Sequence, residues 1–140
     1  MSAAVYRAPM RARDHDAAPG AGAELGLEQG VVGIGDKTGR RLERFAELPD
    51  GSFVWTRDAE GLYHLGAVAG PWRRDDSPAA RAVGIRNVRP ARWLPQPVAE
   101  DDVPTAVLAT FARGGRNLQR IHDARAERET AALWDAAAAG

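Results

Sequence analysis

The sequence predicts an α+β fold, a small curled sheet or barrel of five or six strands with helices packed on it. Short runs rich in β-branched and aromatic residues, separated by Gly, Pro and Asp turns, occupy residues 5–94. After Pro95 and Pro97, apolar residues recur at helical spacing over residues 102–138. We therefore expect one domain over residues 1–140, strand-rich first and helical at its end.

Length and composition allow a single core. A chain of 140 residues with 44% hydrophobic and 27% charged residues is typical of one globular domain. It contains no apolar run that spans a bilayer, no signal-peptide pattern and no cysteine. We therefore expect a cytoplasmic protein without disulfides or thiolate metal sites, and no membrane partner.

The strand-rich part begins with a strand over residues 5–11, in which Pro9 indicates an edge or bulge. Residues 14–26 are either a loop or a weak helix ending near Gly26 or Gly30. The β-branched run at residues 30–35 is the second strand. Within residues 36–50, Leu42, Phe45 and Leu48 have helical spacing and predict a short helix.

A hairpin follows, with a strand over residues 52–58 that places Phe53 and Trp55 on one face and a second strand over residues 63–68. Residues 83–94 read as the last strand, because Val83, Ile85 and Val88 alternate imperfectly with polar residues. Pro90 places part of that strand at an edge or bulge. The segment between these strands is rich in turns.

Two helices end the chain. Asp102 is expected to be the N-cap of a helix over residues 103–112, which Gly114 and Gly115 terminate. A last helix over residues 117–138 is expected to bury Leu118, Ile121, Leu133 and Trp134.

The patterns that mark catalysis are incomplete. Gly33, Gly35 and Gly39 superficially resemble a dinucleotide loop, but no βαβ repeat follows. A restriction-type nuclease core needs two acids and a lysine, and the only lysine, Lys37, has Gly35 two residues before it. No Ser, His and Asp set has a nucleophile elbow, and His15, His64 and His122 lie far apart. We expect no enzymatic activity, no cofactor and no metal.

Charge and aromatic residues instead indicate binding. Nineteen basic and nineteen acidic residues cancel, which disfavours a generic nucleic-acid coat protein. A local positive face is nevertheless expected between residues 69 and 93, which hold six arginines and two acids. Rings beside guanidinium groups suit a base next to phosphates.

The candidate residues follow from this chemistry. Trp55 and Trp93 suit either a pocket or the core, because tryptophan is mostly buried, whereas Trp72 lies in a polar loop where it is available for stacking. The base-binding candidates are Trp55, Trp72, Trp93, Asp36, Asp75 and Asn87, and the phosphate-binding candidates are Arg73, Arg74, Arg89, Arg92 and Arg116.

Six short motifs follow one another along the chain in an order that can be compared with known families. They are the run at residues 30–35, WTRD at 55–58, YHLG at 63–66, GPWR at 70–73, VRPARWL at 88–94 and GGRNLQRI at 114–121. Together they resemble the PUA-like superfamily, specifically the EVE-like domains associated with modification-dependent bacterial restriction systems. The resemblance covers residues 5–122. It implies a small β-barrel with flanking helices that engages a modified base, often 5-methylcytosine or a relative, in an aromatic-lined pocket. It also implies aromatic residues at the positions of Asp36 and Arg74 in close relatives.

We therefore favour a non-catalytic DNA-binding reader that flips a modified base into an aromatic pocket and serves a nuclease or other effector chain. One alternative is an RNA-binding PUA-like module, which would stack a base and use the 2′-hydroxyl. Another is a protein-interaction domain, which a flat apolar patch around Trp72 would favour.

Overall fold

The computed structural model describes residues 3–12 and 17–139, so the candidate ligand His15 lies outside the described residues. The strands of the described chain are β1 (Val5–Arg7), β2 (Val31–Ile34), β3 (Phe53–Arg57), β4 (Tyr63–Val68), β5 (Arg73–Arg74), β6 (Asn87–Trp93) and β7 (Gln119–Arg120). Its helices are α1 (Ala21–Gln29), α2 (Arg40–Glu47), α3 (Pro78–Val83), α4 (Thr105–Arg113) and α5 (Ala124–Ala139), with a 3-10 turn at Glu100–Asp102.

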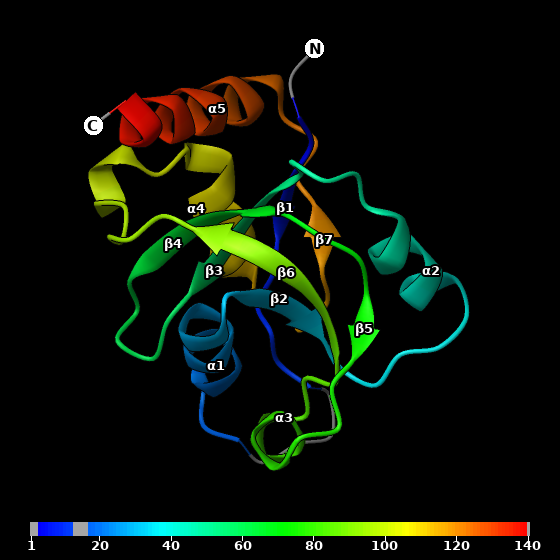
Figure 1. The fold of residues 1–140 in the computed structure, drawn as a ribbon. Helices are drawn as coiled ribbons and strands as arrows, with labels where there is room; N and C mark the ends of the chain where they lie inside the picture. Colours follow the sequence, from blue (N-terminus) through cyan, green and yellow to red (C-terminus); the bar gives the residue numbers. More distant parts are fainter. Residues whose placement is uncertain (1–2, 13–16, 140) are drawn as a thin grey trace.

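The strands form one mixed sheet in the order β2-β6-β4-β3-β1-β7, and the short β5 also pairs with β6. β1 runs parallel to β3, and every other pairing between the described strands is antiparallel. Figure 1 shows the sheet curling so that helices cover it from several sides, with α4 and α5 at one end and α1 and α3 at the other. This arrangement confirms the predicted α+β class.

Alternation along the strands divides the core between the two faces of the sheet. Phe53 and Trp55 point toward α4 and α5, where they pack with Val107 and other residues of one buried cluster. Val54, between them, joins the second cluster, which includes Phe45 of α2. A period of two buries alternate residues on opposite faces, as a sheet covered on both sides requires.

Several predicted elements are confirmed. The run at 30–35 contains β2, α2 lies within the predicted helical segment, and β3 and β4 pair as the expected hairpin. The weak helix is α1, which ends at Gly30 with a φ of 69°, a conformation that glycine adopts without strain. Pro90 pairs with Val31 of β2 on one side, and on the other side it lies between the residues that pair with β4 and those that pair with β5, so its missing N–H falls at a break in the ladder there.

The strand predicted over residues 83–94 was wrong at its start. Val83 is the last residue of α3, and β6 begins only at Asn87. The turn-rich segment thus contains a short helix, because the Ser77 hydroxyl accepts a hydrogen bond from the Ala80 N–H and Pro78 occupies the first turn. The first strand is also shorter than predicted and ends at Arg7.

The predicted beginnings of the last two helices were also wrong. Asp102 belongs to the 3-10 turn, while α4 starts after Pro104 without a side-chain cap. The last helix starts at Ala124, because residues 119–120 pair with β1 as β7 and the Ile121 N–H donates to the Val5 carbonyl. Asp123 then caps α5 by accepting from the Ala126 N–H. Sheet pairing with a distant strand therefore overrides the local helical pattern.

Arg89 fastens α2 to the sheet. Its side chain is only 3% exposed, and it donates to the carbonyls of Phe45 and Leu48 at the end of α2 and to the Gly70 carbonyl. Its remaining nitrogen pairs with Asp50 at 2.9 Å. Burial lowers the pKa of Arg89 while Asp50 opposes that shift. The predicted phosphate ligand is therefore enclosed and fully engaged inside the protein.

Because no other side chain offers this fork of donors, we expect Arg89→Lys to lower the free energy of unfolding by about 3 kcal/mol. Urea denaturation measures the change. Arg92→Lys on the same strand is the matched control, since Arg92 is exposed, and should stay within about 0.5 kcal/mol of wild type. Equal stabilities for Arg89→Lys and the control would contradict this role.

Candidate functional site

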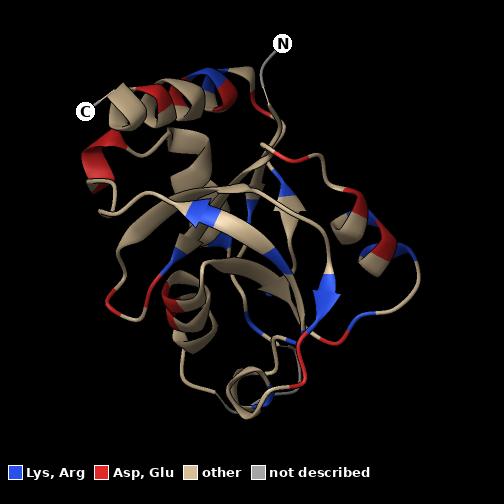
Figure 2. Cartoon of the chain, viewed as in Figure 1, with Lys and Arg blue, Asp and Glu red and all other residues tan. Residues whose placement is uncertain are grey.

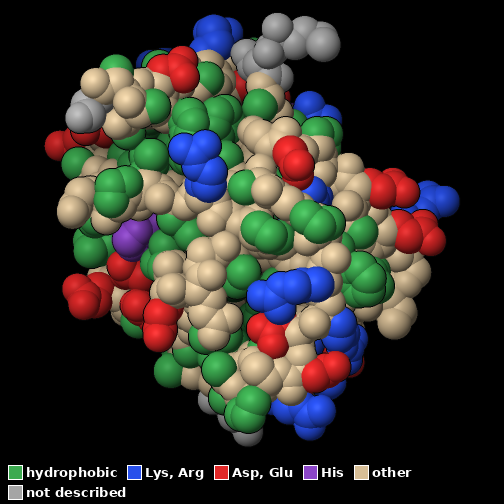
Figure 3. Space-filling view, viewed as in Figure 1, with side chains coloured by type: hydrophobic (Ala, Val, Ile, Leu, Met, Phe, Trp, Pro, Cys, Tyr) green, Lys and Arg blue, Asp and Glu red, His purple; other side chains and the backbone are tan. Residues whose placement is uncertain are grey.

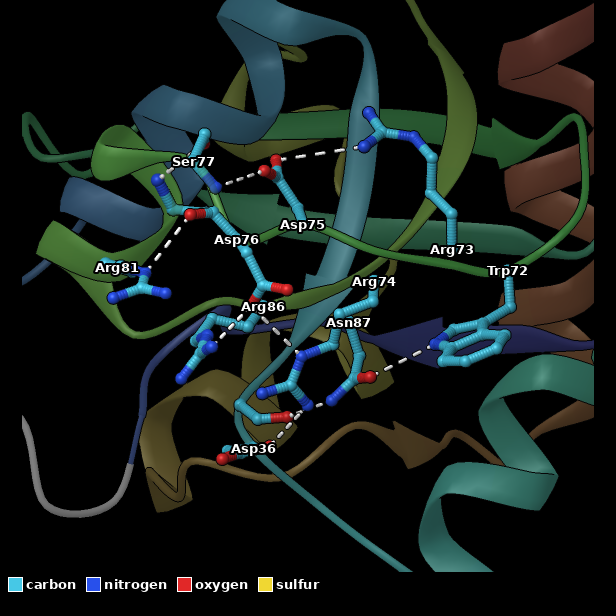
Figure 4. Close-up of polar contacts among 12 residues, drawn as sticks. Asp36, Trp72, Arg73, Arg74, Asp75, Asp76, Ser77, Arg81, Arg86 and Asn87 are labelled. Atoms are coloured by element: carbon cyan, nitrogen blue, oxygen red, sulfur yellow. Dashed lines mark hydrogen bonds and ion pairs between the residues drawn. The ribbon is translucent and has the colours of Figure 1, made fainter.

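Trp72 and Asn87 form a fixed pair beside the end of β2. The indole N–H of Trp72 donates to Asn87 Oδ1 at 3.1 Å, and Asn87 Nδ2 donates to the Gly35 carbonyl at 2.8 Å. Asn87 is fully buried, whereas Trp72 keeps 40% of its surface exposed. Figure 4 shows the two side chains facing each other. The hydrogen bond to Asn87 therefore fixes the Trp72 ring while part of the ring remains exposed to solvent.

The charged residues around this pair neutralise one another. Arg74 bonds to Asp36 at 2.7 Å and to Asp76 at 3.3 Å, and Asp76 also pairs closely with Arg86 (Figure 4). The hydrogen bond to Asp36 raises the pKa of Arg74, and the bond from Arg86 is the chief cause that lowers the pKa of Asp76. The positions where the resemblance implies aromatic residues, 36 and 74, thus hold an ion pair.

Asp75 anchors α3. It is 8% exposed, and its Oδ1 accepts a hydrogen bond from the Ser77 N–H at 3.0 Å. That bond lowers the pKa of Asp75, with a smaller contribution from Arg73, whose guanidinium lies 3.9 Å away. Asp75 is thus occupied by the start of α3 and not presented to solvent.

The remaining predicted residues are scattered. Trp55 is fully buried and donates its indole N–H to Thr130 of α5, so it belongs to the core. Trp93 is half-buried, donates to the Val31 carbonyl and lies over Gly66, where any Cβ would meet its ring at 2.6 Å. Arg92 lies over the Trp134 ring, 5.9 Å from its centroid. Among the five predicted phosphate ligands, which are Arg73, Arg74, Arg89, Arg92 and Arg116, only Arg116 lines the cavity described next.

The predicted positive face between residues 69 and 93 is largely neutralised. Figure 2 shows the cationic β5 followed directly by acidic residues, and Figure 3 shows cationic and acidic side chains interspersed on this face. Each of its arginines except Arg92 has an acidic or carbonyl partner in the structure. This face is therefore not a strong phosphate attractor.

A cavity of about 780 Å³ lies instead between β1, the end of β2, α2 and the segment 116–122. We call it the α2 cavity. Its apolar lining includes Tyr6, Ile34, Leu48 and Leu118. Its volume is in the range that a nucleotide-sized ligand occupies. Figure 1 places α2 beside the sheet edge that β7 forms.

The α2 cavity is strongly cationic. Six basic side chains line it against one acid, Glu47; they are Arg7, Lys37, Arg41, Arg44, Arg116 and Arg120. Arg41 and Arg44 are exposed and make no ion pair with the described residues. Uncompensated cations in a concave site focus positive potential and attract anions.

Arg7 contributes a buried charge to the same cavity. It is 4% exposed and donates to the carbonyls of Thr110, Gly114 and Asn117 at 2.7–3.2 Å. Burial lowers its pKa, as does the nearby charge of Arg113, and its Nε has no hydrogen-bond partner among the described residues. Arg7 thus carries a cation to the cavity wall without a carboxylate to balance it.

The two clusters share one stretch of chain. Gly35 and Lys37 line the α2 cavity, while Asp36 between them pairs with Arg74, and the Gly35 carbonyl binds Asn87. Trp72 itself does not line the cavity. The Trp72–Asn87 pair and the cavity are therefore neighbours, not one pocket.

Of the residues that line the α2 cavity, only Arg116 was predicted from the sequence as a site residue. One usable signal was the spacing of Arg41 and Arg44, three residues apart on the same short helix whose apolar face is Leu42, Phe45 and Leu48. The contribution of Tyr6 and Arg120 had no signal, because only the pairing of β1 with β7 brings residues 6 and 120 together.

No protein-family model and no curated protein matches the sequence. Among solved structures, the chain is similar to the YTH domain of the Zygosaccharomyces rouxii MRB1 protein in complex with N6-methyladenosine RNA, with a TM-score of 0.53 and 14% identity over 94% of this chain and 86% of that chain. A protein from Agrobacterium tumefaciens aligns over 94% of this chain and 92% of its own with 16% identity, at a TM-score of 0.41 that is too low to assign a fold. At 14% identity the likeness to the YTH domain shows a common fold.

In residues 3–12 and 17–139, α5 and the shorter helices all lack the length and apolar character of a membrane span.

The lowered pKa of Asp75 predicts a pH-dependent contribution to stability. A depressed folded-state pKa stabilises the fold above the unfolded value of about 3.9 and loses that effect as the pH falls through the lower folded value. We expect Asp75→Asn to be less stable than wild type at pH 6 and the difference to shrink as the pH falls below the unfolded value of about 3.9. Urea denaturation at pH 6, 4 and 3 measures it. A difference that is constant across this range would contradict the assignment.

Proposed function

We propose that this protein is a non-catalytic reader of a modified nucleotide in nucleic acid, and that the nucleotide binds in the α2 cavity. The observation that carries the proposal is a cavity of about 780 Å³ lined by six basic side chains and one acid on a chain of zero formal charge. An anionic ligand with an apolar part fits such a lining better than a neutral or cationic one.

The division of the lining supports a nucleotide in particular. Tyr6 and Leu48 offer an aromatic ring and an apolar surface to a base, while Arg41 and Arg44 offer cations to its phosphates. Glu47 is the single carboxylate, and carboxylates accept hydrogen bonds from exocyclic amino groups such as that of cytosine. A base of that kind would place its donor edge toward the end of α2.

The fold adds independent support. The YTH domain with the similar fold was solved in complex with N6-methyladenosine RNA, so a fold of this kind accommodates a modified nucleotide. The motifs that resemble EVE-like domains point in the same direction. They extend the proposal to a modified cytosine in DNA and to a restriction system whose effector is another chain.

RNA is the second candidate, and the RNA ligand of the similar YTH domain favours it. The two ligands differ in the 2′-hydroxyl, which is both donor and acceptor. Gln119 and Asn117 at the cavity wall carry side-chain amides that suit such a group.

The test is a fluorescence-anisotropy titration with DNA duplexes containing cytosine, 5-methylcytosine or 5-hydroxymethylcytosine, and with RNA with and without N6-methyladenosine. A buried methyl group contributes about 0.8 kcal/mol, so we expect at least about fourfold preference for one modified ligand. Two salt concentrations separate this preference from phosphate contacts, which are salt-sensitive and blind to modification. If the protein binds none of these ligands, the proposal is wrong.

Arg44→Ala should weaken binding to modified and plain ligands alike and reduce the slope of log K against log salt by about 0.9 for duplex DNA. Arg128→Ala is the matched control, because Arg128 is exposed on α5 and lines none of the described cavities. Equal slopes for the two variants would place the phosphates elsewhere.

We expect the base next to the bound nucleotide to stack on the exposed ring of Trp72 beside the α2 cavity, so Trp72→Ala should weaken strand binding by about 5- to 150-fold. Because Trp72→Ala also removes the donor to the buried Asn87, it should lower the free energy of unfolding by about 1–3 kcal/mol. Trp93→Ala should lower the free energy of unfolding by about 2–4 kcal/mol, because its ring is packed between β4 and the core. Unaltered affinity in Trp72→Ala would remove Trp72 from the site and leave the α2 cavity as the place of binding.

A further inference from the structure

A second cavity lies on the other flank of Arg7. It has a volume of about 280 Å³, and its lining includes Arg11, Arg57, Phe111 and Gly115. Arg7 lines both this cavity and the α2 cavity. The buried guanidinium is therefore a common wall, with one cavity on each side of it.

Two further residues connect these spaces. A small hollow of about 20 Å³ is lined by Arg11, which also lines the second cavity, and by Arg116, which also lines the α2 cavity. Each pair of hollows therefore shares one arginine in its lining. We call these three neighbouring hollows together the depression; they share lining residues from β1, the residues after it and the segment 114–116.

This depression carries a strong excess of positive charge. Eight basic side chains line its three parts, against the acids Glu47 and Asp58. Asp58 is already engaged, because its Oδ2 lies 2.8 Å from His64 Nε2 and its Oδ1 accepts from the Leu62 N–H. Of the cations in the second cavity, Arg11 is exposed and makes no ion pair with the described residues.

Two glycines, which we call the Gly114–Gly115 ridge, line the second cavity next to Arg7. Gly114 and Gly115 have φ angles of 77° and 120°, and a Cβ on Gly115 would lie 2.8 Å from Arg7 Nη2. The absence of side chains keeps this ridge low and lets a ligand backbone approach it closely. Phe111, partly exposed beside it, offers a ring for a neighbouring base.

Resting on the proposed function, we infer that the second cavity holds the phosphodiester backbone next to the bound nucleotide. The nucleic-acid strand then crosses the Gly114–Gly115 ridge over Arg7, with one nucleotide in the α2 cavity and the adjoining phosphate at Arg11. A ligand longer than one nucleotide therefore gains affinity through contacts that a mononucleotide does not make.

The experiment compares ligand lengths in two series of single strands, DNA containing 5-methylcytosine and RNA containing N6-methyladenosine. Each series consists of the nucleoside monophosphate and strands of three, five and nine nucleotides. Wild type should bind the strands more tightly than the monophosphate. Arg11→Ala should weaken strand binding by about 3- to 10-fold and lower the salt slope by about 0.7, with monophosphate affinity unchanged.

Arg11→Glu should abolish most of the increase in affinity with strand length, and Arg128→Ala should retain that increase. Arg44→Ala, in contrast, should weaken the monophosphate and the strands together. The inference is overturned if Arg11→Ala and Arg11→Glu keep the full length dependence, or if wild type binds the monophosphate as tightly as the longest strand. Either result leaves the proposed function intact, whereas binding of no ligand in either series or in the duplex titration overturns both.

Discussion

Two buried arginines set the geometry on which the rest of this structure depends. Arg7 extends from β1 to the carbonyls at the end of α4, and Arg89 extends from β6 to those at the end of α2. The last carbonyls of a helix have no intrahelical partner and carry the negative end of its dipole. A guanidinium satisfies several of them at once and balances their charge. Desolvation nevertheless lowers the pKa of both arginines, so their burial is tolerated only because these contacts are complete or nearly so.

The same two contacts shape the candidate site. Arg89 holds α2 against the sheet, and Arg7 holds the segment that follows α4, so the two walls of the α2 cavity are positioned from strands that are not neighbours in the sheet. Arg7, Arg41 and Arg44 line the cavity without an acidic partner among the described residues, whereas Arg73, Arg74 and Arg86 around β5 form ion pairs. A protein of zero formal charge thereby obtains one cationic concave surface, and its position depends on which arginines find partners.

The periodic parts of the chain were the predictable ones. Phe53 and Trp55 alternate with Val54, and Leu42, Phe45 and Leu48 recur at helical spacing, so burial on one face identifies each element from its own residues. One error lies where a distant partner decides, and another where a local cap was overlooked. Residues 119–121 have a helical pattern but complete the edge of β1, and residues 78–83 follow a cap and a proline that outweigh their turn-like composition.

By itself, the sequence determined the α+β class, the hairpin, the helix α2 and the availability of Trp72, because each follows from local periodicity or from a polar loop around an aromatic residue. Only the tertiary structure decided which charges are neutralised. Asp36 and Arg74 are 38 positions apart yet form an ion pair. The sequence suggests that Arg89 is a surface cation, although in the structure it donates to carbonyls inside the protein. The electrostatic role of an arginine depends on its nearest acceptors, and the fold brings these from remote parts of the chain.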